Sequence, residues 1–193
     1  MSVALRMEEL SRTFAVGRRL FGPPKGLVHA VRPVTLDVPT GQTLGIVGES
    51  GCGKSTLARM LVGLEQPTTG RIEIEGQDFA AAKPAEFGRM IQYVFQDPIS
   101  SLNPRKSVRA IMEAPLVHLH GMGRAARAER IAEIFDSVNL REEFLDRFPH
   151  EFSGGQAQRI SIARALAAAP RILVLDEPVS ALDVSVQAQV LNL

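Results

Sequence analysis

The chain has 193 residues, enough for one domain of ordinary size that buries roughly 70% of its unfolded surface. Apolar residues make up 45% and charged residues 22% of the chain, and a formal net charge of +1 gives no electrostatic case for binding nucleic acid. The only cysteine, Cys52, cannot form an internal disulfide, which favours a reducing compartment. No apolar run approaches the ~18 residues of a membrane span, so any membrane contact is expected to go through a partner.

The first elements in chain order are predicted strands. Residues 34–38 and 71–75 alternate apolar and polar side chains, which is typical of strands with one wetted face. Residues 44–47 are apolar at nearly every position, so we expect a strand buried on both faces of a parallel sheet.

A glycine-rich loop over residues 48–55 follows, and it fits the motif G-x-x-x-x-G-K-[ST]. It stands between the expected strand at 44–47 and an apolar helix predicted over residues 56–64. The glycines let the backbone N–H groups point inward, and the helix start adds roughly half a positive charge, so the loop is expected to cradle phosphate oxygens of ATP. The expected nucleotide-binding residues here are Gly48, Glu49, Ser50, Gly51, Cys52, Gly53, Lys54, Ser55 and Thr56.

Two of these residues have specific expected roles. Lys54 should reach the β- and γ-phosphates, and the Ser55 hydroxyl should ligate Mg²⁺. Cys52 is interpreted as a small filler residue, because the chain offers no second redox group near it.

A helical region is predicted from about residue 107 to residue 145. Apolar residues recur there at steps of three and four between charged residues: Ile131, Ile134, Phe135 and Val138. The four histidines, by contrast, lack the spacing of metal ligands: His29, His118, His120 and His150. The element pattern predicts an α/β core interrupted by a helical insert.

The next feature is an apolar run, residues 172–175, that ends in Asp176 and Glu177. It predicts a second strand buried on both faces of a parallel sheet, with two carboxylates at the edge where α/β sheets bind ligands. Neighbouring strand residues point in opposite directions. One carboxylate can therefore hold Mg²⁺, directly or through water, while the other orients and deprotonates an attacking water.

The turn Ser153-Gly154-Gly155-Gln156 would mean little by itself. With Gln96 between the glycine-rich loop and this turn, and with Ser-Ala-Leu-Asp at residues 180–183 after the acids, the chain resembles the nucleotide-binding subunits of ABC transporters from end to end. The resemblance implies one ATP-binding domain over residues 1–193. Its fold would be α/β: a P-loop NTPase core with a mainly parallel sheet, an N-terminal antiparallel β subdomain, and a helical subdomain inserted at about 97–165.

The resemblance also implies site roles. Two ATP-binding subunits, identical or different, would face head to tail, so that the turn at 153–156 of one contacts the γ-phosphate held by the other. Gln96 would touch Mg²⁺ and sense the membrane subunit, and Asp176 would be a further Mg²⁺ ligand. Glu177 would be the catalytic base and Asp183 the D-loop aspartate. Phe14 is the best candidate to stack on adenine, although Phe21 is close by and a buried core phenylalanine is an equal alternative.

The segment at residues 96–105 resembles the corresponding segment of oligopeptide and dipeptide importer ATPases, and nickel and glutathione importers share it. We expect a loop that docks on the membrane subunit. The expected function is ATP hydrolysis that powers solute import, of peptides above all. The expected partners are membrane permease subunits and, indirectly, an extracytoplasmic solute-binding protein, with the chain on the cytoplasmic face of the membrane.

Two other classes of function stay open. DNA-repair or chromosome ATPases share these motifs but insert long coiled coils or zinc modules between loop and turn, and the corresponding interval here has neither. The second open class is a module that binds ATP without hydrolysing it. It stays open because the resemblance places the switch histidine, which contacts the γ-phosphate, beyond residue 193. The chain is therefore expected to be truncated at its C-terminus. Its last segment, residues 184–191, alternates like a strand although the resemblance makes it a helix.

Overall fold

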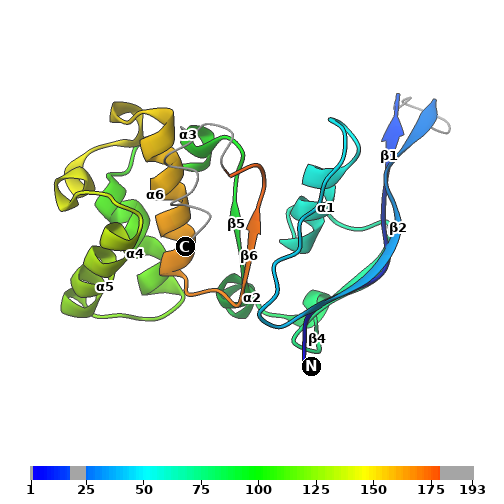
Figure 1. Cartoon of the computed structure of the whole chain (residues 1–193), viewed down its shortest axis with the longest axis horizontal. Coiled ribbons are helices and arrows are strands. Elements are labelled where there is room, and N and C mark those ends of the chain that lie inside the picture. The colour runs from blue at the N-terminus through cyan, green and yellow to red at the C-terminus, as the bar shows by residue number, and fades with distance from the viewer. Residues whose placement is uncertain (1, 18–24, 179–193) are drawn as a thin grey trace. The chain divides into compact units, whose positions relative to one another are not determined.

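The computed structural model describes residues 2–17 and 25–178, which belong to two compact units, an N-terminal unit (residues 1–83) and a C-terminal unit (residues 84–193). Residues 179–193, with Asp183 among them, lie outside the described part. The N-terminal unit contains a long β-hairpin, one α-helix and two short strands (Figure 1). Its elements are β1 (Val3–Val16), β2 (Gly26–Pro39), α1 (Lys54–Leu61), β3 (Thr69–Ile74), β4 (Gln77–Asp78) and the 3-10 turn η1 (Phe79–Ala81).

The strands of the N-terminal unit form one antiparallel sheet in the order β2-β1-β3-β4. The predicted alternation is confirmed in β3, where Ile72 and Ile74 are buried while Arg71 is exposed. In β2 it is weaker, because Leu36 is exposed and its apolar neighbours are only half-buried. The buried apolar residues of this unit come from β1, β2, β3 and α1: Leu5, Met7, Leu10, Val31, Leu57, Ala58, Met60, Leu61, Ile72 and Ile74.

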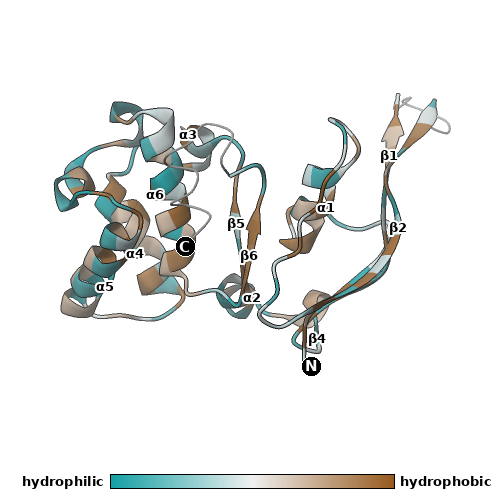
Figure 2. Ribbon diagram, in the orientation of Figure 1, coloured by the Kyte–Doolittle hydropathy of each residue, from teal (hydrophilic) through white to brown (hydrophobic). Residues whose placement is uncertain are grey.

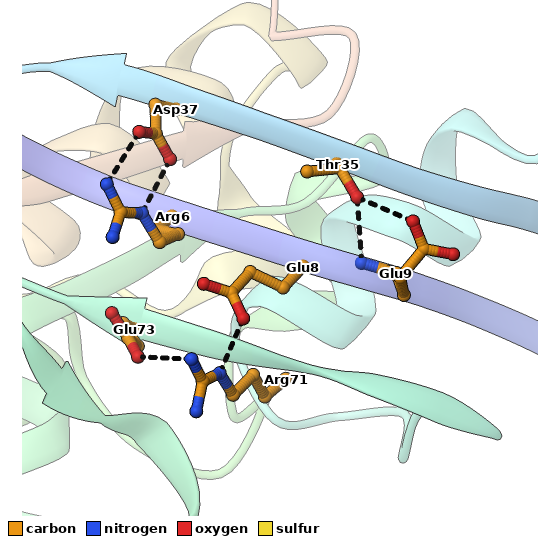
Figure 3. A network of polar contacts seen from close by, with 7 residues as sticks. All are labelled: Arg6, Glu8, Glu9, Thr35, Asp37, Arg71 and Glu73. Carbon is orange, nitrogen blue, oxygen red and sulfur yellow. Dashed lines mark hydrogen bonds and ion pairs between the residues drawn. The ribbon is translucent and has the colours of Figure 1, made fainter.

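Polar side chains cross-link the strands on the sheet's wetted face (Figure 3). Arg6 of β1 donates two hydrogen bonds of 2.8 Å to Asp37 of β2, and Arg71 of β3 donates one of 2.8 Å to Glu8 of β1. Because a one-residue slip would move each partner to the other face of the sheet, these pairs help to fix the register of three strands. The hydrogen bond from Arg6 lowers the pKa of the Asp37 carboxyl, and the same bond raises the pKa of Arg6.

One sequence prediction for this unit is wrong. Residues 44–47 have no strand pairing, and Leu44, Ile46 and Val47 are 44%, 44% and 92% exposed. A parallel strand needs a neighbouring strand to take its backbone N–H and C=O groups. The sheet of the N-terminal unit is antiparallel and does not include this segment, and the parallel strands among the described residues belong to the other unit. The predicted helix at 56–64, in contrast, is present as α1.

The C-terminal unit combines two parallel strands with helices (Figure 1). Its first elements are α2 (Pro84–Met90), β5 (Ile91–Val94) and the one-turn helix α3 (Pro98–Ser101). The others are α4 (Val108–His118), α5 (Arg124–Ser137), the 3-10 turns η2 (Glu142–Asp146) and η3 (Pro149–Glu151), α6 (Gly154–Ala167) and β6 (Ile172–Leu175). Within the described residues, no helix is both long and apolar enough to span a bilayer.

The predicted helical region is confirmed as α4, α5 and η2. The four residues that carried its periodicity, Ile131, Ile134, Phe135 and Val138, are all buried. They join one apolar core with residues of α4 and α6, among them Met112, Leu116 and Ile160. Ser107 begins α4 by accepting a hydrogen bond from the backbone N–H of Ala110.

Strands β5 and β6 pair in parallel, from Ile91 opposite Ile172 to Val94 opposite Leu175. The prediction of a parallel strand at 172–175 is therefore confirmed, and β6 is apolar along its whole length in Figure 2. The prediction that it is buried on both faces is wrong, since its first three residues are half-buried and Leu175 is 42% exposed. It has one neighbouring strand in the described residues, so one long edge of β6 is left without a strand to cover it.

The Arg6–Asp37 pair gives a pH prediction for the N-terminal sheet. Because the pKa of Asp37 is lower in the folded than in the unfolded chain, its stabilising effect is present above the ordinary value of 3.8 and is lost as the pH falls through the folded-state pKa. Asp37→Asn should lower the thermal midpoint slightly at pH 7, since the pair is exposed. The difference from the parent should shrink below that pH, and a difference that widened on acidification would contradict this.

Candidate functional site

The glycine-rich loop closes around the Lys54 ammonium, which donates hydrogen bonds to the carbonyl oxygens of Gly48 (2.8 Å) and Glu49 (2.9 Å). Lys54 is also the first residue of α1, and Gly53 is its N-cap. Gly51 and Gly53 have φ angles of 80° and 103°, in the left-handed region that disfavours a Cβ. The loop backbone is thus bent back on the lysine immediately before a helix start, which is the arrangement that binds phosphate groups.

Two glycines of this loop closely approach other atoms, Gly48 a side chain and Gly53 the backbone. A Cβ on Gly48 would lie 2.6 Å from the Sγ atom of Cys52. A Cβ on Gly53 would overlap the carbonyl oxygen of Ala30 in β2. The loop is therefore packed against its own cysteine at one end and against the hairpin β1–β2 at the other.

The first turn of α1 carries Ser55 and Thr56, both half-buried. The first four N–H groups of a helix have no partner within it, so this turn presents donors together with the Ser55 hydroxyl. The three expected Mg²⁺ ligands, Ser55, Gln96 and Asp176, offer a hydroxyl, an amide and a carboxylate oxygen. Oxygen donors of this kind are the ligands that Mg²⁺ prefers, so the chemistry of the set fits the ion.

In the C-terminal unit, the two parallel strands deliver Asp176 to a buried position. Its backbone N–H donates to the carbonyl of Val94 (3.1 Å), which continues the β5–β6 ladder by one step. Its Oδ2 accepts a 2.7 Å hydrogen bond from the hydroxyl of Tyr93, and only 7% of the residue is exposed. The carboxylate is thereby fixed at the carboxyl end of the strands.

The neighbouring acid lies in a different environment. Glu177 is exposed, has φ 49°, and accepts a 2.8 Å hydrogen bond on Oε2 from the side-chain amide of Gln96. The two adjacent carboxylates therefore have different partners, Tyr93 for Asp176 and Gln96 for Glu177, and Glu177 turns away from the strand in a left-handed conformation. The structure also brings Gln96 and Glu177 together, although 81 residues separate them.

Sequence reasoning missed Tyr93. This residue lies on β5, three residues before Gln96, and is the only tyrosine in the chain. Its hydroxyl is the partner that holds Asp176. A lone tyrosine on a short apolar strand next to a predicted site residue was the available signal, because a buried Tyr O–H usually needs an acceptor.

The turn at residues 153–156 is a capped helix start. The Ser153 hydroxyl accepts from the backbone N–H of Gln156, and the Gln156 side chain accepts from the backbone N–H of Ser153 (3.1 Å), which is a capping box. Gly154 and Gly155 form the first turn of α6. Before the turn, Phe152 is buried edge-to-face against Phe144, with ring centroids 5.4 Å apart.

A sequence profile of the ABC transporter family matches residues 31–180, which include the glycine-rich loop, Gln96, the capped turn and the two acids. The chain belongs to the ABC transporter family. This confirms the family resemblance. The fold class is confirmed as well, because the dimeric ATP-binding cassette MJ0796, solved in a post-hydrolysis state with ADP and Pi, matches 97% of this chain and 80% of its own at 29% identity, with a TM-score of 0.86.

Curated relatives of this ABC chain are peptide transport proteins by name. The di/tripeptide transport ATP-binding protein DppF of Pseudomonas aeruginosa is 46% identical over 198 residues, which cover 100% of this chain and 60% of that protein. The oligopeptide transport ATP-binding protein OppF of Escherichia coli is 46% identical over 197 residues, which cover 99% of this chain and 59% of that protein. The chain thus spans about 60% of the length of these relatives.

The segment after Gln96 differs from the loop that the sequence predicts for this ABC chain. Asp97 caps the one-turn helix α3 by accepting from the backbone N–H groups of Ile99 and Ser100, and Pro98 occupies its first turn. An Asp-Pro pair is a good helix start, which is why part of the expected loop is helical. Residues 102–105 are irregular, as predicted.

The far end of α3 is tied to the helix that follows the capped turn. Arg164 of α6 donates a 2.7 Å hydrogen bond to the carbonyl of Ser101, and the hydroxyls of Ser101 and Ser161 are 3.4 Å apart. Burial of Arg164 lowers the pKa of its guanidinium. The segment after Gln96 and the helix that starts at the capped turn are therefore parts of one packed assembly.

The remaining predicted site residues are placed as follows. Phe14 lies on β1, half-buried, in the same unit as the glycine-rich loop. Two histidines have hydrogen-bond partners: His29 pairs with the Thr13 hydroxyl, and His120 with the Ala168 carbonyl. The described residues contain no group of three or more side chains that could hold a metal ion through His, Cys, Asp or Glu alone.

The close approach of the loop to β2 gives a stability prediction. Gly53→Ala should destabilise the protein by more than about 1 kcal/mol, because the new Cβ meets both an unfavourable φ and the Ala30 carbonyl. Gly51→Ala is the matched control, since its φ is also positive but a Cβ there meets no atom within 4 Å. Chemical denaturation should show a larger loss for Gly53→Ala, and equal losses would argue against the packing of the loop on β2.

Proposed function

We propose that this chain binds ATP with Mg²⁺ and, as part of a larger ABC transporter, hydrolyses it to power the import of peptides through a membrane permease. The observation that carries the proposal is the glycine-rich loop, bent around Lys54 at the N-terminus of α1. Gly51 and Gly53 take the left-handed backbone angles of this bend, and a Cβ at Gly53 would overlap the backbone carbonyl oxygen of Ala30. The similarity to peptide transport ATP-binding proteins supports the choice of solute.

The N-terminal unit supplies the groups that bind the nucleotide. The Lys54 ammonium donates to the β- and γ-phosphates, and the N–H groups of residues 48–56 surround their oxygens. Phe14 stacks on the adenine ring. Bound Mg²⁺ would supply positive charge against the negative charge that develops during transfer. The Ser55 hydroxyl and the carboxylate of Asp176 would hold this ion, and Tyr93 keeps that carboxylate in place.

The C-terminal unit supplies the groups for hydrolysis. Glu177 accepts a proton from water as the water oxygen attacks the γ-phosphorus, and the bond from that phosphorus to the bridging oxygen of ADP breaks. The Gln96 amide, by donating to Glu177, holds the carboxylate in one orientation. Because Gln96 directly precedes α3, a shift of that segment would move the partner of the base.

The capped turn is the part of the site that serves a second ATP-binding subunit. Ser153 uses its oxygen as an acceptor within the capping box, so its O–H hydrogen remains a donor for a phosphate of the facing subunit. Gly154 and Gly155 add two N–H groups at the start of a 14-residue helix. Such a site favours a head-to-tail dimer, identical or mixed, docked on permease subunits at the cytoplasmic face of the membrane. A solute-binding protein would deliver the peptide from the other side.

Nucleotide binding can be tested on the chain itself. At a free ATP concentration a hundredfold above Kd, with Mg²⁺ present, binding should stabilise the fold by about 2.7 kcal/mol. Lys54→Ala should remove most of this shift, because the loop then lacks its fixed positive charge. Differential scanning fluorimetry measures both. Equal ATP-induced shifts in the two proteins would overturn the assignment of the glycine-rich loop.

Hydrolysis can be tested in the assembled transporter. Glu177→Gln should retain ATP binding but lower turnover by about 10²- to 10⁴-fold, because the amide cannot accept the proton from water. Phosphate release and ATP affinity are measured in parallel. Glu151→Gln is a control, since that carboxylate accepts from the backbone N–H of Phe148 outside the proposed site. Parent-like turnover in Glu177→Gln would show that another group is the base.

A further inference from the structure

Arg12 of β1 is a shielded cation between a carboxylate and an aromatic ring. Its guanidinium forms an ion pair with Glu65. Its guanidinium carbon also lies 4.5 Å from the centroid of the Phe14 ring. The side chains of Arg12 and Glu65 are only 23% and 27% exposed, and the buried Nε of Arg12 has no hydrogen-bond partner among the described residues. The carboxylate therefore holds the guanidinium against one face of the ring.

The Arg12–Glu65 pair links the strand that carries Phe14 to the helix that follows the glycine-rich loop. Glu65 comes shortly after α1, and its backbone N–H and that of Leu64 both donate to the carbonyl of Arg59 in the last turn of that helix. Arg12 itself belongs to β1, two residues before Phe14. The position of the ring is thus coupled to the helix whose first turn carries Lys54 and Ser55.

A second contact ties the same part of the hairpin to the loop. Arg12 stands opposite Val31 of β2, whereas Thr13 stands opposite His29, so Ala30 is the extra residue of a bulge. The carbonyl of Ala30 is the group that Gly53 of the loop approaches. The loop end and the Arg12–Phe14 stack therefore attach to the hairpin at neighbouring positions.

We propose that Arg12, fixed by Glu65, is a positioning residue that covers one face of the Phe14 ring and orients the opposite face to stack on the base of the nucleotide. The inference rests on the proposed function, because it assumes that Phe14 contacts adenine. A cation over a ring stabilises one ring orientation, and a ring that is already oriented loses less side-chain entropy when a ligand stacks on it. A purely structural ion pair would affect the fold but would not distinguish a ligand with a base from one without.

Two ligands make that distinction. ATP carries the base, and inorganic tripolyphosphate carries only the charged groups that the glycine-rich loop binds. Isothermal titration with each ligand, in the presence of Mg²⁺, is compared for the parent chain, Arg12→Leu, Phe14→Leu and the double variant. Glu65→Gln releases Arg12 without altering β1, so it tests the inference even if Arg12→Leu folds poorly. Arg71→Leu is the matched control, because Arg71 is also a strand arginine held in an ion pair, with Glu8, but contacts no aromatic ring among the described residues.

Phe14→Leu should weaken ATP binding and leave tripolyphosphate binding unchanged. Arg12→Leu should weaken ATP binding by roughly three- to tenfold, again without effect on tripolyphosphate. In the Phe14→Leu background, Arg12→Leu should cause no further loss, because the two residues act through one stack. Glu65→Gln should change ATP affinity in the same direction, and Arg71→Leu should bind both ligands like the parent.

The inference is overturned if Arg12→Leu weakens both ligands equally, leaves ATP affinity unchanged, or has its full effect without Phe14. In those cases the proposed function stands, provided that the parent chain binds ATP and that the Lys54→Ala variant does not. Failure of the parent chain to bind ATP would instead count against the proposed function, and the inference would fall with it.

Discussion

The parallel pairing of β5 with β6 is the constraint on which the candidate catalytic groups depend. The ladder aligns Val94 with Leu175, so the two strands end side by side at the same edge of the sheet. Asp176 comes directly after β6, and its carboxylate is held by Tyr93 of β5. Gln96 and Glu177 then meet just beyond the ladder. A shift of one residue in this register would turn Tyr93 to the opposite face and separate it from the acid.

The N-terminal unit depends on a different kind of contact, in which backbone approaches backbone. Gly53 reaches the Ala30 carbonyl because it has no Cβ, and the strand bulge at Ala30 makes that carbonyl available. The ion pair of Arg12 with Glu65 adds a side-chain link between the same hairpin and the end of α1. The loop, its helix and the strand that carries Phe14 are thus held together by short-range contacts within this unit.

Much of the local structure follows from the sequence. Periodicity predicted α4 and α5, alternation predicted β3, and the loop motif predicted the helix after Lys54, because each pattern acts over a few neighbouring residues. Errors arose where the partner is distant: residues 44–47 are apolar but have no strand beside them, and β6 is only half-buried. Helix α3 was predicted to be a loop, although its start could have been recognised locally, because Asp97 and Pro98 are an ordinary helix start. The site residues were named from motif order, and their catalytic and binding roles remain predictions.

The sequence by itself determined the family and the residue types of the site, because a motif such as that at residues 48–55 needs its glycines, lysine and serine at a fixed spacing within one short segment. Only the tertiary structure decided which distant groups meet. Tyr93 holds Asp176 across 83 residues, Gln96 reaches Glu177 across 81, and Arg12 joins Glu65. These contacts depend on strand register and on the path of the chain between the partners. Hydrogen bonds and ion pairs act over only a few ångströms, so no local pattern in the sequence records them.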